Sequence, residues 1–247
     1  MDHQPPCSRC SLPKKAIILA GGLGTRLRSI VSDRPKVMAQ VAGRPFLEHL
    51  VLSLQSFGIT HVLFSVGYLR QVIIDYFQDG QAWGLSFDYS IEEAPLGTGG
   101  ALRQCLPWIS HDPVFVLNGD SYCGVNLTDY GSWYHETERV GALVLTKVPH
   151  AERFGQVEWT PEYGISGFHE KTSMNGPSWI NAGVYLFSPR FIFEIPKGER
   201  VSLERDVLPK WVGQGLWGFP SVAPFVDLGT PEGYEDMQKL FSAMPLS

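Results

Sequence analysis

Short apolar runs and longer amphipathic stretches alternate through the first 148 residues of the chain. The stretch 46–58, FLEHLVLSLQSFG, places Leu47, Leu50, Val51 and Leu54 three and four residues apart, which is the spacing of one helix face. Mostly apolar runs such as AIILA and HVLFSVG have the length of buried strands. We therefore expect strands at 16–20, 61–67, 85–91, 113–120 and 141–148, with helices between them at 46–58, 69–78, 97–106 and 130–138.

The order strand, helix, strand is typical of βαβ units, in which the strands run parallel. Repeated along the chain, it predicts an α/β fold: a Rossmann-like open sheet, mainly parallel but mixed, with helices on both faces. After residue 148 the pattern changes to shorter, aromatic-rich runs at 155–160, 164–171 and 179–188, and helical patterns return at 205–212 and 232–241. No linker or repeat divides the chain, so we expect one domain at 15–247, made of a first half at 15–148, a small lobe at 149–230 and a helix within 231–247.

The composition limits the partners. The chain is 44% hydrophobic and 18% charged, with a net charge of -5 and a pI of about 5.8, so it offers no electrostatic attraction to nucleic acid or to an anionic membrane. Its apolar runs fall short of the roughly 20 residues of a membrane span, and its start lacks the apolar core of a signal peptide. We expect the partners to be small molecules and expect no binding to nucleic acid or to a membrane. The expected location is cytoplasmic, and a homo-oligomer is possible.

The four cysteines give little guidance. Cys7 and Cys10 form a C-x-x-C pair, which is half of a zinc site, but Cys105 and Cys123 are single and lie in a predicted helix and a predicted loop. Residues 1–14 are rich in proline and polar side chains and show no periodicity. This composition favours a flexible N-terminal tail over a metal site.

The segment at 15–38, KAIILAGGLGTRLRSIVSDRPKVM, carries the first chemical signal. A strand followed by glycine-rich backbone and a helix start binds phosphate, because free N–H groups and the helix dipole both favour an anion. The P-loop string Gly-x-x-x-x-Gly-Lys-Ser/Thr is absent. A dinucleotide fingerprint would place its third glycine on Leu27 and its acidic residue on Glu48, inside a predicted helix, so an NAD site is disfavoured.

Two cations lie on either side of this glycine-rich turn. Arg26 and Lys36 suit a triphosphate, because a guanidinium clamps two oxygens while an ammonium acts as a point charge. Taken alone, either Arg26 or Lys36 would be explained more simply as a cation exposed on the surface. Together with the string G-G-x-G-T-R-L they favour a nucleotide site.

The chain resembles the sugar-1-phosphate nucleotidylyltransferases, whose signature is a strand followed by G-G-x-G-T-R-L and Pro-Lys-x-Met, found here at 21–27 and 35–38. Within this family it looks most like the D-glycero-α-D-manno-heptose 1-phosphate guanylyltransferases. The likeness continues in the family's order through EEAPLGTGGAL, LNGD, FGQVEW, FHEK, INAGVYLF and VDLGTPEGY.

The resemblance implies a reaction in which a sugar 1-phosphate oxygen attacks the α-phosphorus of a nucleoside triphosphate and pyrophosphate leaves. It makes 15–148 the nucleotide-binding half and 149–230 the sugar-binding half. Catalysis would be mostly positioning and charge neutralisation. It implies Arg26, Lys36, Asp120 and Asp227 as catalytic residues, with the two aspartates holding the cofactor Mg²⁺. Taken alone, Asp120 would equally be a turn residue.

The same residue-by-residue match gives the binding positions. The nucleotide would be bound by Leu19, Gly21, Gly22, Gly24, Thr25, Arg26, Lys36, Glu92, Gly97 and Thr98. The sugar phosphate would be bound by Gly155, Glu170, Lys171, Asn181 and Gly183. Simpler alternatives are a helix N-cap for Thr98 and a buried structural amide for Asn181.

Glu92 informs the choice of base. Relatives that use pyrimidine nucleotides have a glutamine at this position, whereas a carboxylate only accepts hydrogen bonds. Guanine presents two donors side by side, N1–H and the 2-amino group, so a carboxylate favours GTP. Glu92 would otherwise be a polar strand-end residue beside Glu93.

Two classes of function remain. The first is an active transferase that makes GDP-heptose, with mannose-1-phosphate guanylyltransferase or a UDP- or dTDP-sugar pyrophosphorylase as alternatives. The second is a regulatory relative that binds nucleotide sugars without turnover. The complete charge set of Arg26, Lys36, Asp120, Lys171 and Asp227 favours the enzyme.

Overall fold

The computed structural model describes residues 12–22, 24, 27, 33–136, 139–152, 154–162, 164–170 and 176–244 of the 247-residue chain. Most of the predicted tail at 1–14, with Cys7 and Cys10, lies outside these residues. Of its last three residues, Pro13 is buried, and the carbonyl of Lys14 accepts hydrogen bonds from the N–H groups of Thr60 and His61.

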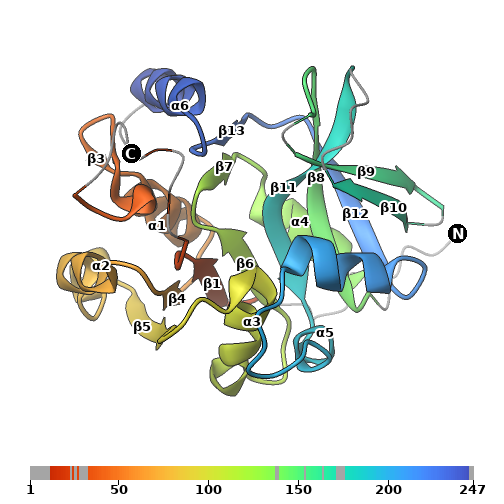
Figure 1. Cartoon of the computed structure of the whole chain (residues 1–247), viewed down its shortest axis with the longest axis horizontal. Helices are drawn as coiled ribbons and strands as arrows, with labels where there is room; N and C mark the ends of the chain where they lie inside the picture. Colours follow the sequence, from red (N-terminus) through yellow and green to blue (C-terminus); the bar gives the residue numbers. More distant parts are fainter. Residues whose placement is uncertain are drawn as a thin grey trace, which may run out of the picture.

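One large sheet forms the centre of the molecule (Figure 1). Its strands are β1 (Lys15–Leu19), β4 (His61–Val66), β5 (Ser86–Ile91), β6 (Val114–Asn118), β8 (Gly141–Val148), β9 (Gly155–Thr160), β10 (Gly164–Glu170), β11 (Ser178–Phe187) and β12 (Leu216–Ser221). Two short pairs accompany it: β2 (Gln40–Val41) with β3 (Arg44–Pro45), and β7 (Ser121–Cys123) with β13 (Phe225–Asp227). The α-helices are α1 (Phe46–Ser56), α2 (Arg70–Phe77), α3 (Gly97–Gln104), α4 (Leu127–His135), α5 (Pro189–Phe193) and α6 (Pro231–Ala243).

The sheet is mixed, as the sequence predicts. The strand order is β10-β9-β11-β6-β1-β4-β5, and β6, β1, β4 and β5 run parallel to one another. β11 joins antiparallel to β6 and to β8, and β8 in turn pairs in parallel with β12. In Figure 1, β9 and β10 therefore stand at one end of the molecule, and β5 with α2 at the other.

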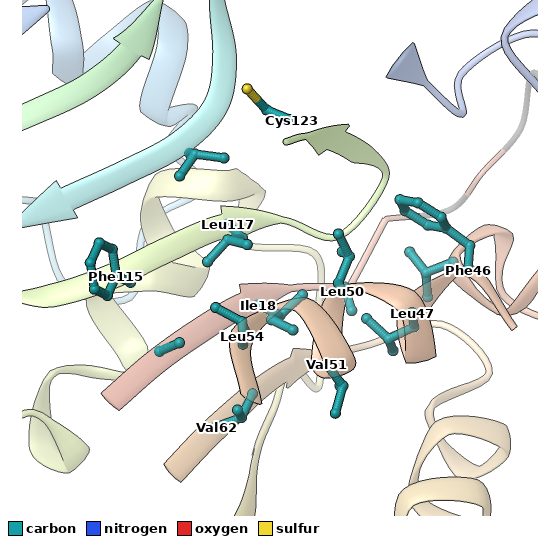
Figure 2. Close-up of a cluster of buried hydrophobic side chains, with 14 of the residues drawn as sticks. Ile18, Phe46, Leu47, Leu50, Val51, Leu54, Val62, Phe115, Leu117 and Cys123 are labelled. Carbon is teal, nitrogen blue, oxygen red and sulfur yellow. The ribbon is translucent and has the colours of Figure 1, made fainter. Parts of the chain in front are cut away.

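The inner parallel strands β1, β4 and β6 bury side chains on both faces, which explains their almost continuous apolar sequences, whereas the edge strand β5 leaves Asp88 and Ile91 exposed. In β1, Ile18 faces a core formed with α1, α4 and α6, while Ile17 faces a second core formed with α3 and α5. Figure 2 shows the first core: α1 crosses the strands and turns Leu50 and Leu54 toward Ile18. The predicted helix at 46–58 is thus confirmed, with its apolar stripe against the sheet.

Several boundaries differ from the prediction. The helix expected at 130–138 begins at Leu127, because Asn126 caps it by accepting from the N–H groups of Thr128 and Asp129. The helical stretch expected at 205–212 is instead a π-helix at Leu203–Val207 followed by a 3₁₀ helix at Leu208–Trp211. Pro209 lacks the N–H that a regular helix would use there.

Cys123 ends strand β7 and is not in a loop. Cys105 directly follows α3, and both thiols are buried and free. Burial raises the pKa of Cys105 to about 12 and that of Cys123 to about 11, so both are thiols near neutral pH.

In the part of the chain that the structure describes, no helix combines the length and the apolar character needed to cross a membrane.

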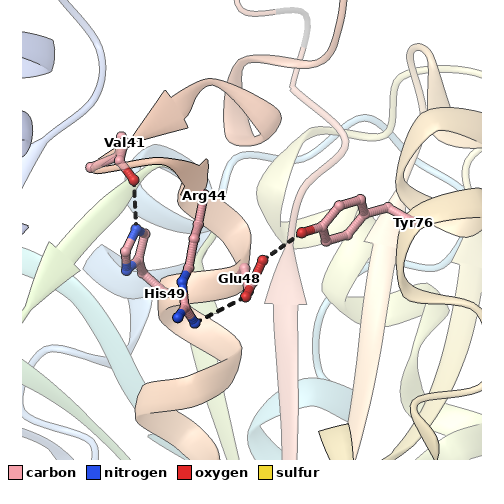
Figure 3. A network of polar contacts seen from close by, with 5 residues as sticks. All are labelled: Val41, Arg44, Glu48, His49 and Tyr76. Carbon is pink, nitrogen blue, oxygen red and sulfur yellow. Dashed lines mark hydrogen bonds and ion pairs between the residues drawn. The ribbon is translucent and has the colours of Figure 1, made fainter. Parts of the chain in front are cut away.

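Glu48 connects α1 to α2 and to β3 (Figure 3). It is 9% exposed, accepts a hydrogen bond of 2.5 Å from the hydroxyl of Tyr76 on α2, and pairs with Arg44 at 3.3 Å. The β2–β3 hairpin is further held by His49, whose Nε2 lies 2.8 Å from the carbonyl of Val41. Glu48 therefore lies inside a helix and is held by protein partners, which agrees with the prediction that it is not the acidic residue of a dinucleotide site.

Candidate functional site

A cavity of about 460 Å³ opens beyond the carboxyl ends of β1 and β6. In open α/β sheets this is where ligands bind. Its lining includes nine residues singled out from the sequence: Leu19, Gly21, Gly22, Gly24, Lys36, Glu92, Gly97, Thr98 and Asp120. Segments far apart in the sequence therefore meet around one cavity.

Two glycines of the turn lie where a side chain has no room. A Cβ on Gly21 would collide with the carboxylate of Glu92. Gly24 has a φ of +59°, and a Cβ there would lie 2.8 Å from that of Lys36. The turn can therefore approach both Glu92 and Lys36 only because these positions are glycine.

Lys36 begins the 3₁₀ helix Lys36–Met38, whose Val37 and Met38 are buried. Its ammonium donates to Oδ2 of Asp120 at 2.5 Å, and the side chains of Lys36 and Asp120 are 12% and 40% exposed. Buried neighbours fix the backbone of Lys36, so a cation and a carboxylate lie together at the cavity wall.

The two predicted metal-binding aspartates lie at the adjacent ends of two paired strands. Asp120 immediately precedes β7, and Asp227 ends β13 opposite Ser121, the first residue of β7. The N–H of Leu228 donates to the backbone carbonyl of Asp120 at 2.8 Å, which fixes the pair. The carboxylate of Asp227 lies against Gly229, which lines the cavity.

These two carboxylates beside an open cavity suit Mg²⁺, which proteins usually hold by one or two carboxylates together with substrate phosphates. No cluster of three or more histidine, cysteine, aspartate or glutamate side chains suited to a metal occurs among the described residues. The two aspartates would leave further positions around such an ion to substrate phosphates and water.

Glu92 follows β5 and is 9% exposed. Its Oε2 accepts from the N–H of Leu96 at 3.0 Å, and its Oε1 lies 3.5 Å from the hydroxyl of Ser65. Burial raises the pKa of this carboxyl, and the hydrogen bond from Leu96 opposes the shift. Its neighbour Glu93 is instead 80% exposed and lies 3.6 Å from Arg70.

Gly97 and Thr98 begin α3. Gly97 has a φ of +70°, and a Cβ there would lie 2.5 Å from the carbonyl oxygen of Val201. The N-cap alternative for Thr98 is wrong, since Leu96 is the cap residue and makes no side-chain cap bond. The Thr98 hydroxyl instead donates to Glu204 at 2.7 Å and accepts from the N–H of Leu203 at 2.8 Å.

The predicted sugar-site residues lie on the neighbouring strands. The half-buried side chain of Asn181 donates to the hydroxyl of Tyr185 and accepts from the N–H of Gly183, which are contacts of the kind that the structural alternative requires. A Cβ on Gly183 would lie 2.7 Å from the hydroxyl of Ser121, which places this part of β11 beside the residue that follows Asp120. Gly155 begins β9 and pairs with Glu170 at the end of β10.

Three predicted residues, Thr25, Arg26 and Lys171, lie outside the described residues, as does the side chain of Glu170. Their roles stay predictions.

Sequence reasoning missed three polar side chains of the cavity: Asn118, Arg200 and Glu204. Asn118 is the polar end of an otherwise apolar strand, and its buried Oδ1 has no hydrogen-bond partner among the described residues. Arg200 precedes the π-helix and Glu204 is its second residue, and nothing in the local sequence pattern there signals a cavity.

The model of the family described as nucleotidyl transferase matches residues 15–242. Mannose-1-phosphate guanylyltransferase of Mycobacterium tuberculosis is 36% identical over 222 residues; the match covers 89% of this chain but only 62% of that protein. D-glycero-alpha-D-manno-heptose 1-phosphate guanylyltransferase of Aneurinibacillus thermoaerophilus is 37% identical over 227 residues, covering 91% of this chain and 97% of its own length.

Solved structures agree in fold. The crystal structure of HddC from Yersinia pseudotuberculosis has a TM-score of 0.82 and 32% identity, covering 92% of this chain and 99% of its own. The same protein complexed with GMP-PN gives a TM-score of 0.81. The inositol-1-phosphate CTP transferase of T. maritima, at 22% identity and a TM-score of 0.77, shares the fold.

Proposed function

The chain belongs to the nucleotidyl transferase family, and on that premise we propose that it transfers a guanylyl group from GTP to a sugar 1-phosphate. An oxygen of the sugar phosphate attacks the α-phosphorus of GTP. The bond from that phosphorus to the bridging oxygen of the β-phosphate breaks, and pyrophosphate leaves. The products are a GDP-sugar and pyrophosphate.

The observation that carries the proposal is the single cavity that joins a buried carboxylate, Glu92, to a cation–carboxylate pair, Lys36 and Asp120. A guanine donates two hydrogens from one edge, which suits the acceptor Glu92, and a triphosphate requires cations. The similarity to HddC, a protein whose structure was solved with GMP-PN, supports guanine as the base.

The roles of the residues follow from their positions. Leu19, Gly21, Gly22 and Gly24 bring backbone close to the nucleotide, while Gly97 lines the cavity on the side proposed for the base. Lys36 neutralises phosphate charge, and Arg26 and Thr25 of the same turn are assigned to the triphosphate by their match to the family motif. Thr98 acts through its bond to Glu204, since its only proton is already donated there.

Asp120 and Asp227 would hold Mg²⁺, which supplies a positive charge to the phosphates when bound. Before it binds, the ammonium of Lys36 compensates the charge of Asp120, so that this carboxylate is paired at the cavity wall. The chain's own contribution is to fix these groups on the β7–β13 pair and on the 3₁₀ helix.

For the sugar 1-phosphate we favour D-glycero-α-D-manno-heptose 1-phosphate. Two bacterial heptose 1-phosphate guanylyltransferases match this chain over 97% and 96% of their own length. The mannose-1-phosphate enzyme is the second candidate because its 36% identity is similar. Gly155, Glu170, Lys171, Asn181 and Gly183 are proposed to bind this substrate, with Lys171 at its phosphate.

The test is a pyrophosphate-release assay with Mg²⁺ that crosses four nucleoside triphosphates with heptose, mannose and glucose 1-phosphates. We expect the largest kcat/KM for GTP with heptose 1-phosphate. Turnover with none of the pairs, despite GTP binding, would support a non-catalytic binder. A preference for UTP or dTTP would contradict the guanylyl assignment.

A further inference from the structure

The amino end of α3 carries a tightly docked segment from the sugar-binding half. The N–H groups of Gly99 and Gly100 donate to the carbonyl of Val201 at 2.9 and 3.2 Å, and the N–H of Val201 donates to the carbonyl of Leu96 at 2.8 Å. Side chains at Gly97 and Gly100 would collide with backbone of this segment. The glycines that precede Ala101 therefore serve to let residues 199–203 approach.

Glu204 also stabilises the packing of residues 199–203 against α3. Its Oε2 accepts from the hydroxyls of Thr98 at 2.7 Å and Ser202 at 3.0 Å. The N–H of Leu203 donates to the hydroxyl of Thr98 at 2.8 Å, so Thr98 and Glu204 close a small ring of hydrogen bonds between α3 and the π-helix. The backbone on either side of Val201 is thus fixed relative to the cavity.

Because residues 199–203 pack against α3, Arg200 lies at the wall of the cavity. Arg200 lies between Glu199, which packs against Gly100, and Val201, which is bonded to Leu96. It is exposed, lines the cavity, and makes no hydrogen bond or ion pair within the described part of the chain. Its guanidinium is therefore available to a ligand at the α3 end of the cavity.

We propose that Arg200 is a second specificity residue for guanine and donates to its N7 and O6 acceptors. The inference rests on the proposed function, in which Glu92 accepts from the N1–H and 2-amino edge of the same base. An arginine fork matches the adjacent N7 and O6 atoms of guanine, while adenine replaces O6 by an amino donor. The base would then be held by a carboxylate on one edge and a guanidinium on the other.

The position of Arg200 favours the base over the phosphates. The residues that flank it, Glu199 and Val201, lie against Gly100, Gly97 and Leu96 at the α3 start, and the N–H of Leu96 also donates to Glu92. The cation and carboxylate assigned to the phosphates, Lys36 and Asp120, instead pair with each other beside Gly24 and β7.

The experiment compares GTP with 7-deaza-GTP, which lacks only the N7 acceptor. The assay measures kcat/KM in the wild type, Arg200→Met and Arg200→Lys, with Arg205→Met as the control: Arg205 is exposed on the same segment and does not line the cavity. We expect the wild type to prefer GTP over 7-deaza-GTP by about 5- to 20-fold, and Arg200→Met to lose about 10- to 100-fold with GTP.

The decisive result is how the ratio of kcat/KM for GTP to that for 7-deaza-GTP changes from one variant to the next. Arg200→Met should use GTP and 7-deaza-GTP equally well, Arg200→Lys should keep only part of the preference, and Arg205→Met should behave as wild type. A wild type that does not distinguish the two nucleotides overturns the proposal, as does an equal loss of both in Arg200→Met, which would indicate a phosphate contact.

Failure of the proposed function would be recognised separately. In that case the wild type releases no pyrophosphate from GTP with any sugar 1-phosphate. Calorimetric titration of the same proteins with GTP and 7-deaza-GTP then tests the Arg200 contact. The Kd values should show a preference for GTP in the wild type and none in Arg200→Met.

Discussion

Replacing Glu92 with glutamine separates hydrogen-bond polarity from shape. The wild-type Oε2 accepts from the N–H of Leu96 at 3.0 Å, so the amide oxygen of the new side chain takes that bond and its NH₂ group occupies the place of Oε1. That group would then point a donor at the donors of guanine. The substitution should leave the fold intact, because the bond that anchors the side chain to the protein is kept.

The size of the effect follows from the bonds that are lost. Hydrogen bonds to a charged group contribute about 1.5–3 kcal/mol, and about 1.4 kcal/mol is tenfold, so kcat/KM for GTP should fall roughly 10- to 150-fold. UTP and dTTP present a carbonyl that can accept from the new NH₂ group, so their use should stay level or rise.

The assay is pyrophosphate release at limiting GTP, ITP, UTP and dTTP, with Glu93→Gln as the matched control because Glu93 is exposed and does not line the cavity. ITP lacks the 2-amino group, so the wild-type preference for GTP over ITP should shrink in Glu92→Gln. An unchanged GTP preference in Glu92→Gln would refute the assignment of Glu92 as the guanine acceptor.

Three further predictions concern catalysis and stability. Asp120→Asn and Asp227→Asn should each lower kcat at least about 100-fold with Mg²⁺ present while the urea midpoint stays near wild type; full activity in either variant removes that residue from the site. Tyr76→Phe removes a donor from the buried Glu48 and should lower the free energy of unfolding by about 1–3 kcal/mol, measured by urea denaturation. Burial raises the pKa of Glu92, so its contribution to folding stability is fully present below the unfolded-state pKa and lost as pH rises through the folded one. Urea denaturation across pH should therefore show Glu92→Gln gaining stability relative to wild type as pH increases, and a constant difference would contradict this.

The local pattern was sufficient for the parallel half of the fold. Strands β1, β4 and β6 are near-continuous apolar runs because both their faces are covered, and α1 shows its apolar stripe plainly. The pairing of β11 between β6 and β8, and of β12 with β8, joins segments distant in sequence. Periodicity reports which face of a strand is buried, and it carries no information about such long-range partners.

The cavity residues likewise divide into those that the sequence indicates and those that it does not. Lys36, Asp120 and Glu92 lie in family motifs or at strand ends, so the sequence indicates them. Arg200 and Glu204 reach the cavity through a contact between Thr98 and Glu204 that spans 106 residues, and through an irregular π-helix. Neither the charge pattern nor the helical period distinguishes these residues from surface ones.

Identification of the product in a competition reaction tests the guanylyl transfer most directly. The purified protein is incubated with Mg²⁺, heptose 1-phosphate and equal concentrations of GTP, ATP, UTP and dTTP, and the nucleotide sugars are identified by mass spectrometry. The account predicts a predominant GDP-heptose product formed with one pyrophosphate per molecule. A predominant UDP- or dTDP-heptose, or consumption of GTP without any nucleotide sugar, would contradict it.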